Sequence, residues 1–209
     1  MKHFKPLIIV SFVVLISMPD LARGQSYREG LSVPPVQVFS GMLDFAKSGK
    51  YEKVEKSLQV LMPLVSALSQ KYKIDHESEL KSALSALLYA DSISAKDKDR
   101  VLKGIQRLIF SDMRDLFDQA DIVIKESKDK AQIKFKTALL DYLLLGPFVE
   151  AKNFPSDGKI KRAFRDIQFT IDSSAPYGTS GGGAILPETT KKMSDDILKE
   201  ILVVLPELK

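Results

Sequence analysis

Cysteine is absent from the 209-residue chain, which excludes several kinds of structure and chemistry at once. Without thiols the protein has no disulfides, thiolate metal sites, iron–sulfur clusters or covalently attached c-type haem. A lipid anchor on a cleavage-site cysteine is excluded as well. The fold must therefore be stabilised by an ordinary apolar core, which a chain of this length can bury.

Histidine is nearly absent too, since only His76 lies beyond the first few residues. It stands between Asp75 and Glu77 at an expected helix start, where we expect an exposed N-terminal cap. "HESEL" lacks the second histidine of H-E-x-x-H, and S-x-x-K at Ser78 lacks its S-D-N and K-T-G companions. We therefore assign no catalytic residue and expect no cofactor.

A phosphate-binding loop is also missing, although "APYGTSGGGAILPE" is rich in glycine. Gly178 and Gly183 have the G-x-x-x-x-G spacing, but alanine and isoleucine follow where lysine and a hydroxyl residue are needed. No strand precedes the cluster. Its Ser, Thr and Pro content predicts a flexible linker at 175–187, between a helical domain at 25–174 and a C-terminal helix at 188–209.

A strong charge imbalance is lacking as well. Removal of residues 1–24 takes away three basic residues and one acidic residue, which leaves 28 basic and 26 acidic residues, a net charge of +2. Proteins that bind nucleic acid usually carry a clear basic excess. Together with the leader described next, this near balance argues against a nucleic-acid partner.

What the chain does have begins with a leader. Lys2 and Lys5 precede the apolar run Leu7–Ser17, and small residues lead to a cleavage site after Gly24. This order is typical of a secretory signal peptide. The apolar run is shorter than the roughly 17–25 residues that cross a bilayer. We expect a periplasmic or extracellular mature chain without a transmembrane segment; an uncleaved anchor is the alternative.

Helical spacing of apolar residues dominates the rest, and strand-like alternation is absent. The clearest stripe follows the N-cap Ser94 and comprises Leu102, Ile105, Ile109, Met113, Leu116, Ala120 and Val123. The fold class is therefore all-α, an irregular bundle of about six to seven helices joined by short connections. The expected helices are 35–48, 51–72, 76–92, 95–125, 129–151, 157–172 and about 188–205.

Two stretches resemble each other, which raises the question of internal duplication. "LMPLV" at 61–65 compares with "LGPFV" at 145–149, and residues 73–95 compare with 153–175. Duplication predicts two pseudo-repeated helical hairpins with the 95–125 helix crossing between them. The alternative is the apolar spacing that all helices share.

Pro63 and Pro147 lie inside these apolar runs, where proline removes a helical hydrogen bond. We expect each to bend its helix at a buried place. The bends could line a ligand pocket, or they could only curve helices around the core.

The segment "DMRDLFDQAD" carries aspartates at positions 112, 115, 118 and 121. Clustered carboxylates can bind Mg²⁺ or Ca²⁺, and Asp112 and Asp115 are the candidate metal ligands. A step of three residues spreads the side chains around a helix, however. The favoured interpretation is a solvated, charge-laced face on which Arg114 pairs with Asp118.

A basic cluster, Lys159, Lys161, Arg162 and Arg165, occupies the first turns of the 157–172 helix. Cations there are unfavourable unless something negative compensates them. An anion or an acidic partner would do so, as would carboxylates of the same protein. We expect Lys161 and Arg162 to be exposed.

These observations predict an exported helical protein that works by binding a protein or small-molecule ligand. One alternative is a metal- or small-ligand-dependent enzyme of the cell envelope. Another is a structural subunit that exposes Ile197, Ile201 and Val204 to a partner. An enzyme should bring buried carboxylates with shifted pKa values together.

Overall fold

The computed structural model describes residues 31–89, 94–173 and 185–209, and every regular element in these ranges is a helix. The prediction of an all-α protein is confirmed. The signal peptide and the glycine cluster at 178–183 lie outside the described residues. The elements are α2 (Pro35–Lys47), α3 (Tyr51–Tyr72), α4 (His76–Leu88), α5 (Ala95–Val123), α6 (Lys128–Lys152), α7 (Phe154–Ser173), α8 (Ile185–Val204) and the 3₁₀ turn η1 (Pro206–Leu208).

Side-chain caps set three of the helix starts. The Ser94 hydroxyl accepts the Asp97 N–H at 3.1 Å and the Ser127 hydroxyl accepts the Lys130 N–H at 3.3 Å. The Asp75 carboxylate likewise accepts the Ser78 N–H at 3.0 Å. Each bond satisfies one backbone donor that has no partner within its helix. These local signals explain why the predicted starts of α4 and α5 agree with the structure.

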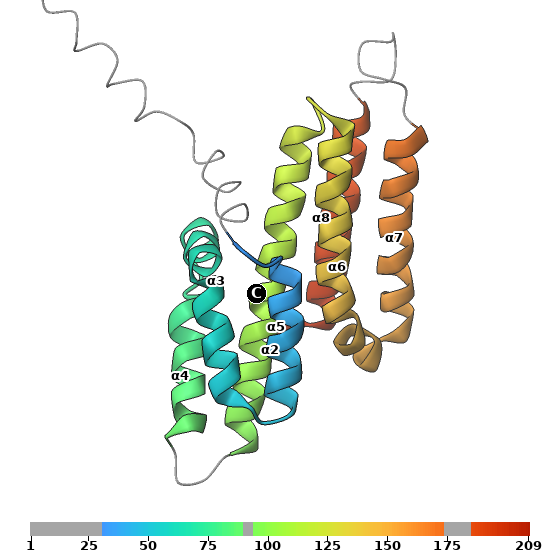
Figure 1. The fold of residues 1–209 in the computed structure, drawn as a ribbon. Coiled ribbons are helices and arrows are strands. Elements are labelled where there is room, and N and C mark those ends of the chain that lie inside the picture. Colours follow the sequence, from blue (N-terminus) through green and yellow to red (C-terminus); the bar gives the residue numbers. More distant parts are fainter. Residues whose placement is uncertain (1–30, 90–93, 174–184) are drawn as a thin grey trace, which may run out of the picture.

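Helix α5 runs through the centre of the molecule (Figure 1). The α3–α4 hairpin packs beside its first half, α6 packs along it, and α7 and α8 complete the other side. Helix α2 contacts α3, α5 and α6. Because helices surround it, α5 buries residues over most of its circumference, from Val101 to Val123.

Close packing and aromatic contacts fix the two sides onto α5. A Cβ atom on Gly104 would lie only 2.7 Å from Leu80 Cδ2, so glycine allows α4 to approach α5. On the other side, the ring centroid of Phe117 lies 5.7 Å from that of Phe164 in α7. The buried Tyr142 hydroxyl of α6 donates to Asp157 at 2.8 Å, which holds the start of α7.

The expectation that Pro63 and Pro147 lie at buried bends is wrong. Both prolines are exposed, inside helices that continue past them. A proline frees the carbonyl four residues earlier, and on the outer face that carbonyl can be hydrated. The residues that carry these carbonyls, Gln59 and Leu143, are exposed as well. Pocket lining by the two prolines stays a prediction.

Helix α8 packs onto the bundle with its apolar side inward. Ile197 and Ile201 are essentially inaccessible, and Val204 is buried beside them. The expectation that a subunit would expose these three residues is therefore wrong. Their stripe completes the core against α5 and α7, as an amphipathic helix should when neighbours are available. Among the described helices, none combines the length and apolarity required to cross a membrane.

Candidate functional site: a polar cluster on α5 and an apolar face on α6

The aspartates of α5 do not form the solvated face expected from the sequence. Asp112 is fully buried and Asp115 is 6% exposed, whereas Asp118 and Asp121 are partly buried. Helical spacing placed Asp115, Asp118 and Asp121 on the side away from the helix's own apolar stripe. Because other helices also pack around α5, part of its polar side is covered too.

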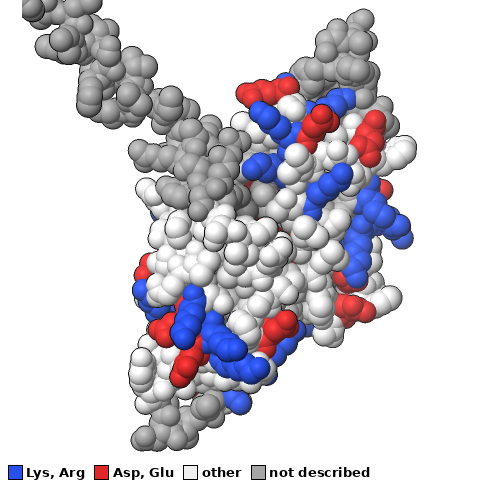
Figure 2. All heavy atoms as spheres, viewed as in Figure 1, with Lys and Arg blue, Asp and Glu red and all other residues white. Residues whose placement is uncertain are grey.

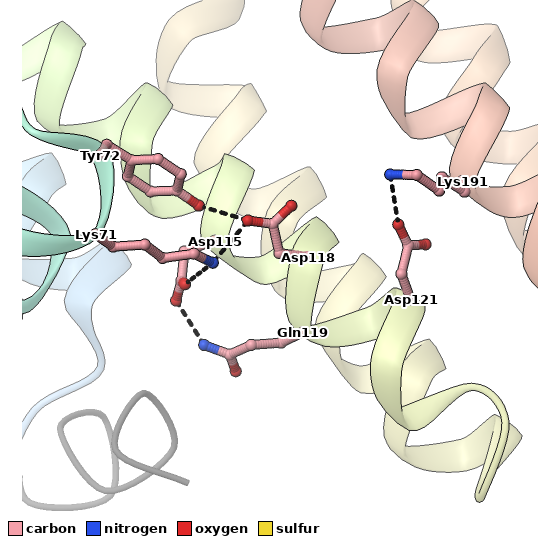
Figure 3. Close-up of polar contacts among 7 residues, drawn as sticks. All are labelled: Lys71, Tyr72, Asp115, Asp118, Gln119, Asp121 and Lys191. Atoms are coloured by element: carbon pink, nitrogen blue, oxygen red, sulfur yellow. Dashed lines mark hydrogen bonds and ion pairs between the residues drawn. The ribbon is translucent and has the colours of Figure 1, made fainter. Parts of the chain in front are cut away.

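A lysine and a tyrosine at the end of α3 contact the middle of this row (Figure 3). Lys71 Nζ lies 2.8 Å from Asp115 Oδ1 and 2.6 Å from Asp118 Oδ2. The Tyr72 hydroxyl donates to Asp118 Oδ2 at 2.9 Å. One cation thus bridges two carboxylates and ties the α3–α4 hairpin to α5, an arrangement stronger than isolated surface pairs. The expected Arg114–Asp118 pair is replaced by these contacts.

Neighbouring groups complete the cluster. Gln119 donates its amide to Asp115 from the next turn of α5. The guanidinium of Arg114 lies 4.4 Å from the centroid of the Tyr72 ring, a cation–π distance. Burial, followed by the charges of Asp118 and Asp115, raises the pKa of Tyr72 far above its usual value. Tyr72 therefore remains a neutral hydrogen-bond donor under all ordinary conditions.

Asp121, the last member of the row, faces α8 instead. Lys191 Nζ lies 3.6 Å from Asp121 Oδ2 (Figure 3). It also lies 3.8 Å from Asp195 Oδ2 of its own helix. Burial, together with the nearby Asp195 and Asp118 carboxylates, raises the pKa of Asp121 to about 6, against the opposing effect of Lys191. The row thus connects α5 to α3 at one level and to α8 at another.

We call Lys71, Tyr72, Asp115, Asp118 and Gln119 the polar cluster, and their contacts limit its chemistry. Asp115 is occupied by Lys71 and Gln119, which are donors that compete with a metal ion. Within the described parts of the chain, no group of three or more histidine and carboxylate side chains is arranged to hold a metal. Metal binding by Asp112 and Asp115 stays a prediction.

His76 is buried, so the expectation of an exposed cap residue is wrong. Asp75 does cap α4, but the next residue turns inward and His76 is 1% exposed. Neither ring nitrogen has a hydrogen-bond partner among the described residues. Burial, assisted by the Arg107 charge, lowers the pKa of His76 to about 4. The ring is therefore neutral at physiological pH, packed as part of the core.

The basic cluster on α7 is half compensated from within the protein. Lys161 and Arg162 are exposed, as predicted. Lys161 Nζ pairs with Asp157 at 2.7 Å, and Lys159 Nζ lies 3.6 Å from Glu200 of α8. These carboxylates supply negative charge at the helix start, where the helix dipole favours it. Anion binding by the remaining Arg162 and Arg165 stays a prediction.

Helix α6 carries a second feature, large apolar side chains that face solvent. Ile133 is 62% exposed, Leu140 is 47% exposed and Leu143 is 49% exposed. Figure 2 shows a broad area without charged side chains where Figure 1 places α2 and the adjoining part of α6. We call Ile133, Leu140, Leu143 and Pro147 the outer face of α6. In the sequence, this face is indicated by the dense apolar run at 138–149, which contains more apolar residues than a single buried stripe of a helix requires.

Comparisons with protein families, curated proteins and solved structures found no match to this chain.

Proposed function

We propose that this chain is an exported helical binding protein and that its ligand is another protein, bound on the outer face of α6. The exposed apolar side chains at 133, 140 and 143 carry the proposal. Monomeric proteins rarely expose contiguous apolar patches larger than a few hundred Å², and larger patches mark interaction sites. The aspartates of α5 support the proposal only indirectly. Lys71, Tyr72 and Lys191 already contact them and join α5 to α3 and α8, so these carboxylates are explained without a ligand.

Photo-crosslinking in cells tests this function directly. A photoreactive amino acid at Leu140 should yield a crosslinked protein product, whereas the same residue at the exposed Lys192 of α8 should not. Leu143→Glu should abolish the Leu140 product, because a charge on the outer face opposes burial. Equal products at Leu140 and Lys192, or none at Leu140, would contradict the proposal.

Export is part of the same proposal and rests on the leader. We propose that cleavage after Gly24 releases a periplasmic or extracellular chain that begins at Gln25. Mass spectrometry of protein recovered from fractionated cells should give this N-terminus. Recovery of the uncleaved chain from the cytoplasm would show that the leader does not act as a signal peptide.

We further propose that the hairpins α3–α4 and α6–α7 arose by duplication. In each, a long helix with an internal proline, Pro63 or Pro147, is followed by a second helix after a short connection. Both hairpins pack against α5. Superposition with the prolines made equivalent should align both helices of each pair. Alignment of only one helix would reduce the similarity to shared apolar spacing.

A further inference from the structure

We propose that the protein bound on the outer face of α6 is a second copy of this chain, with the two α6 helices packed antiparallel. This inference rests on the proposed function, because it uses the same surface. It adds the identity and the orientation of the partner.

The spacing along the outer face is that of a helix-pairing seam. Ile133, Leu140 and Pro147 recur every seven residues. Lys136, Leu143 and Glu150 follow each of them by three. Alternating steps of three and four residues are the a/d pattern with which helices pair, and here the seam points to solvent. The other side of α6 already packs on α5 through Phe135 and other buried residues.

The two charges on the seam make it complementary to itself. Lys136 and Glu150 are both exposed, and they flank the apolar centre formed by Leu140 and Leu143. Fourteen residues separate the two charges, about 21 Å along a helix, so they cannot pair with each other within one chain. In an antiparallel pair centred between Leu140 and Leu143, each Lys136 comes within reach of the partner copy's Glu150. A two-fold axis therefore satisfies both ends of the seam together.

The position of α6 leaves room for this arrangement. In Figure 1 α6 lies in front of α8, with α2 and α7 to either side. The exposure of Ile133, Leu140 and Leu143 shows that none of the described neighbours covers the seam. A contact along one helix of this length is smaller than a standard interface of about 1,600 Å². We therefore expect a reversible dimer whose population depends on concentration.

Sedimentation velocity over a range of concentrations tests for the dimer. The purified protein should sediment increasingly as a dimer, and Leu143→Glu should return it to a monomer. Val203→Glu is the control, because Val203 is also an exposed apolar residue, on α8 instead of α6. It should leave the dimer unchanged.

Charge reversal then tests self-complementarity. Lys136→Glu or Glu150→Lys alone should weaken the dimer about tenfold, since each brings like charges near one another at both ends of the seam. The double variant should restore the original dissociation constant. Recovery in the double variant is expected only when the partner carries the same two residues.

Because the chain contains no cysteine, single introduced cysteines can report the relative orientation of the two α6 helices. Ile133→Cys mixed with Glu150→Cys should be joined by a short thiol crosslinker. Ile133→Cys alone should not, because its two copies would lie about 25 Å apart in the antiparallel pair. The reverse result would overturn the antiparallel arrangement.

A monomer at every concentration would overturn the inference as a whole. If the Leu140 photo-crosslink then captured a different protein, the proposed function would stand and the second copy would be wrong. If it captured nothing, both would be wrong. A captured second copy, lost in Leu143→Glu, is the result expected.

Discussion

Acidification should destabilise this protein through His76, and the effect can be calculated from the structure. The pKa of His76 is about 4 in the folded protein, against 6.5 for an unperturbed histidine, because the ring is buried without hydrogen-bond partners. A histidine whose folded pKa is lowered stabilises the fold above the unfolded pKa. That stability is lost as the pH falls, because the unfolded chain takes up a proton that the folded chain refuses.

The magnitude follows from the two pKa values. Between neutral pH and pH 5 the unfolded histidine becomes almost fully protonated, and linkage gives a loss of about 2 kcal/mol. The loss approaches about 3 kcal/mol near pH 4. Since whole domains are stable by only about 5–15 kcal/mol, this change is readily measured.

Asp121 opposes this trend and has to be separated from it. Burial raises its pKa to about 6 from a usual value of 3.8, so ionised Asp121 destabilises the fold at neutral pH. Protonation as the pH falls through 6 relieves this cost, a gain of about 1 kcal/mol between neutral pH and pH 5. The unmodified protein should therefore show only a small net loss over this range.

Urea unfolding followed by far-ultraviolet circular dichroism, at neutral pH and at pH 5, separates the two groups. His76→Leu should lose no stability from this source and should gain about 2 kcal/mol on the parent protein as the pH falls. Asp121→Asn should instead lose more stability on acidification than the parent. If His76→Leu and the parent change in parallel, the histidine is not neutral and buried, and the reasoning is refuted.

Two further changes test the packing around α5. Gly104→Ala should destabilise the protein by about 1–3 kcal/mol in urea unfolding, because the new Cβ atom meets the fully buried Leu80. Unchanged stability would contradict the close approach of α4 and α5. Lys71→Met should lower the free energy of unfolding by about 1–2 kcal/mol. This loss is smaller than for a fully buried ion pair, because Lys71 is partly exposed. The control Lys56→Met, on the same helix, should leave the free energy of unfolding almost unchanged. Equal losses in the two lysine variants would show that the Asp115 contact contributes little.

The fold was largely predictable because its signals are local. The stripe through Ile105, Ile109 and Met113 predicted the buried side of α5, and Ser94 predicted its start. Cap residues and apolar spacing act within one or two turns of a helix, so the sequence alone expresses them. The helix ranges therefore agree with the structure to within a few residues.

The candidate site was not predictable in the same way, because it depends on neighbours far apart in the chain. The spacing of Asp115 correctly placed it away from the apolar stripe of α5. Nothing in the neighbouring sequence, however, predicts that Lys71 of α3 pairs with it. His76 shows a finer limit. Asp75 caps α4 as expected, but a single step of about 100° around the helix turns the next side chain into the core.

Buried polar residues and exposed apolar residues both depart from the usual pattern of an apolar core and a polar surface. The two departures have opposite implications for function. Asp115 lies inside the bundle and Asp118 at its edge, and the cost of burying such carboxylates is offset within the protein by Lys71 and Tyr72. They are explained once the fold is known. Leu140 and Leu143 are apolar groups outside, and their exposed area has no compensating contact among the described helices. Since a fold gains nothing from apolar area left in water, the outer face of α6 gains stability only when something else covers it.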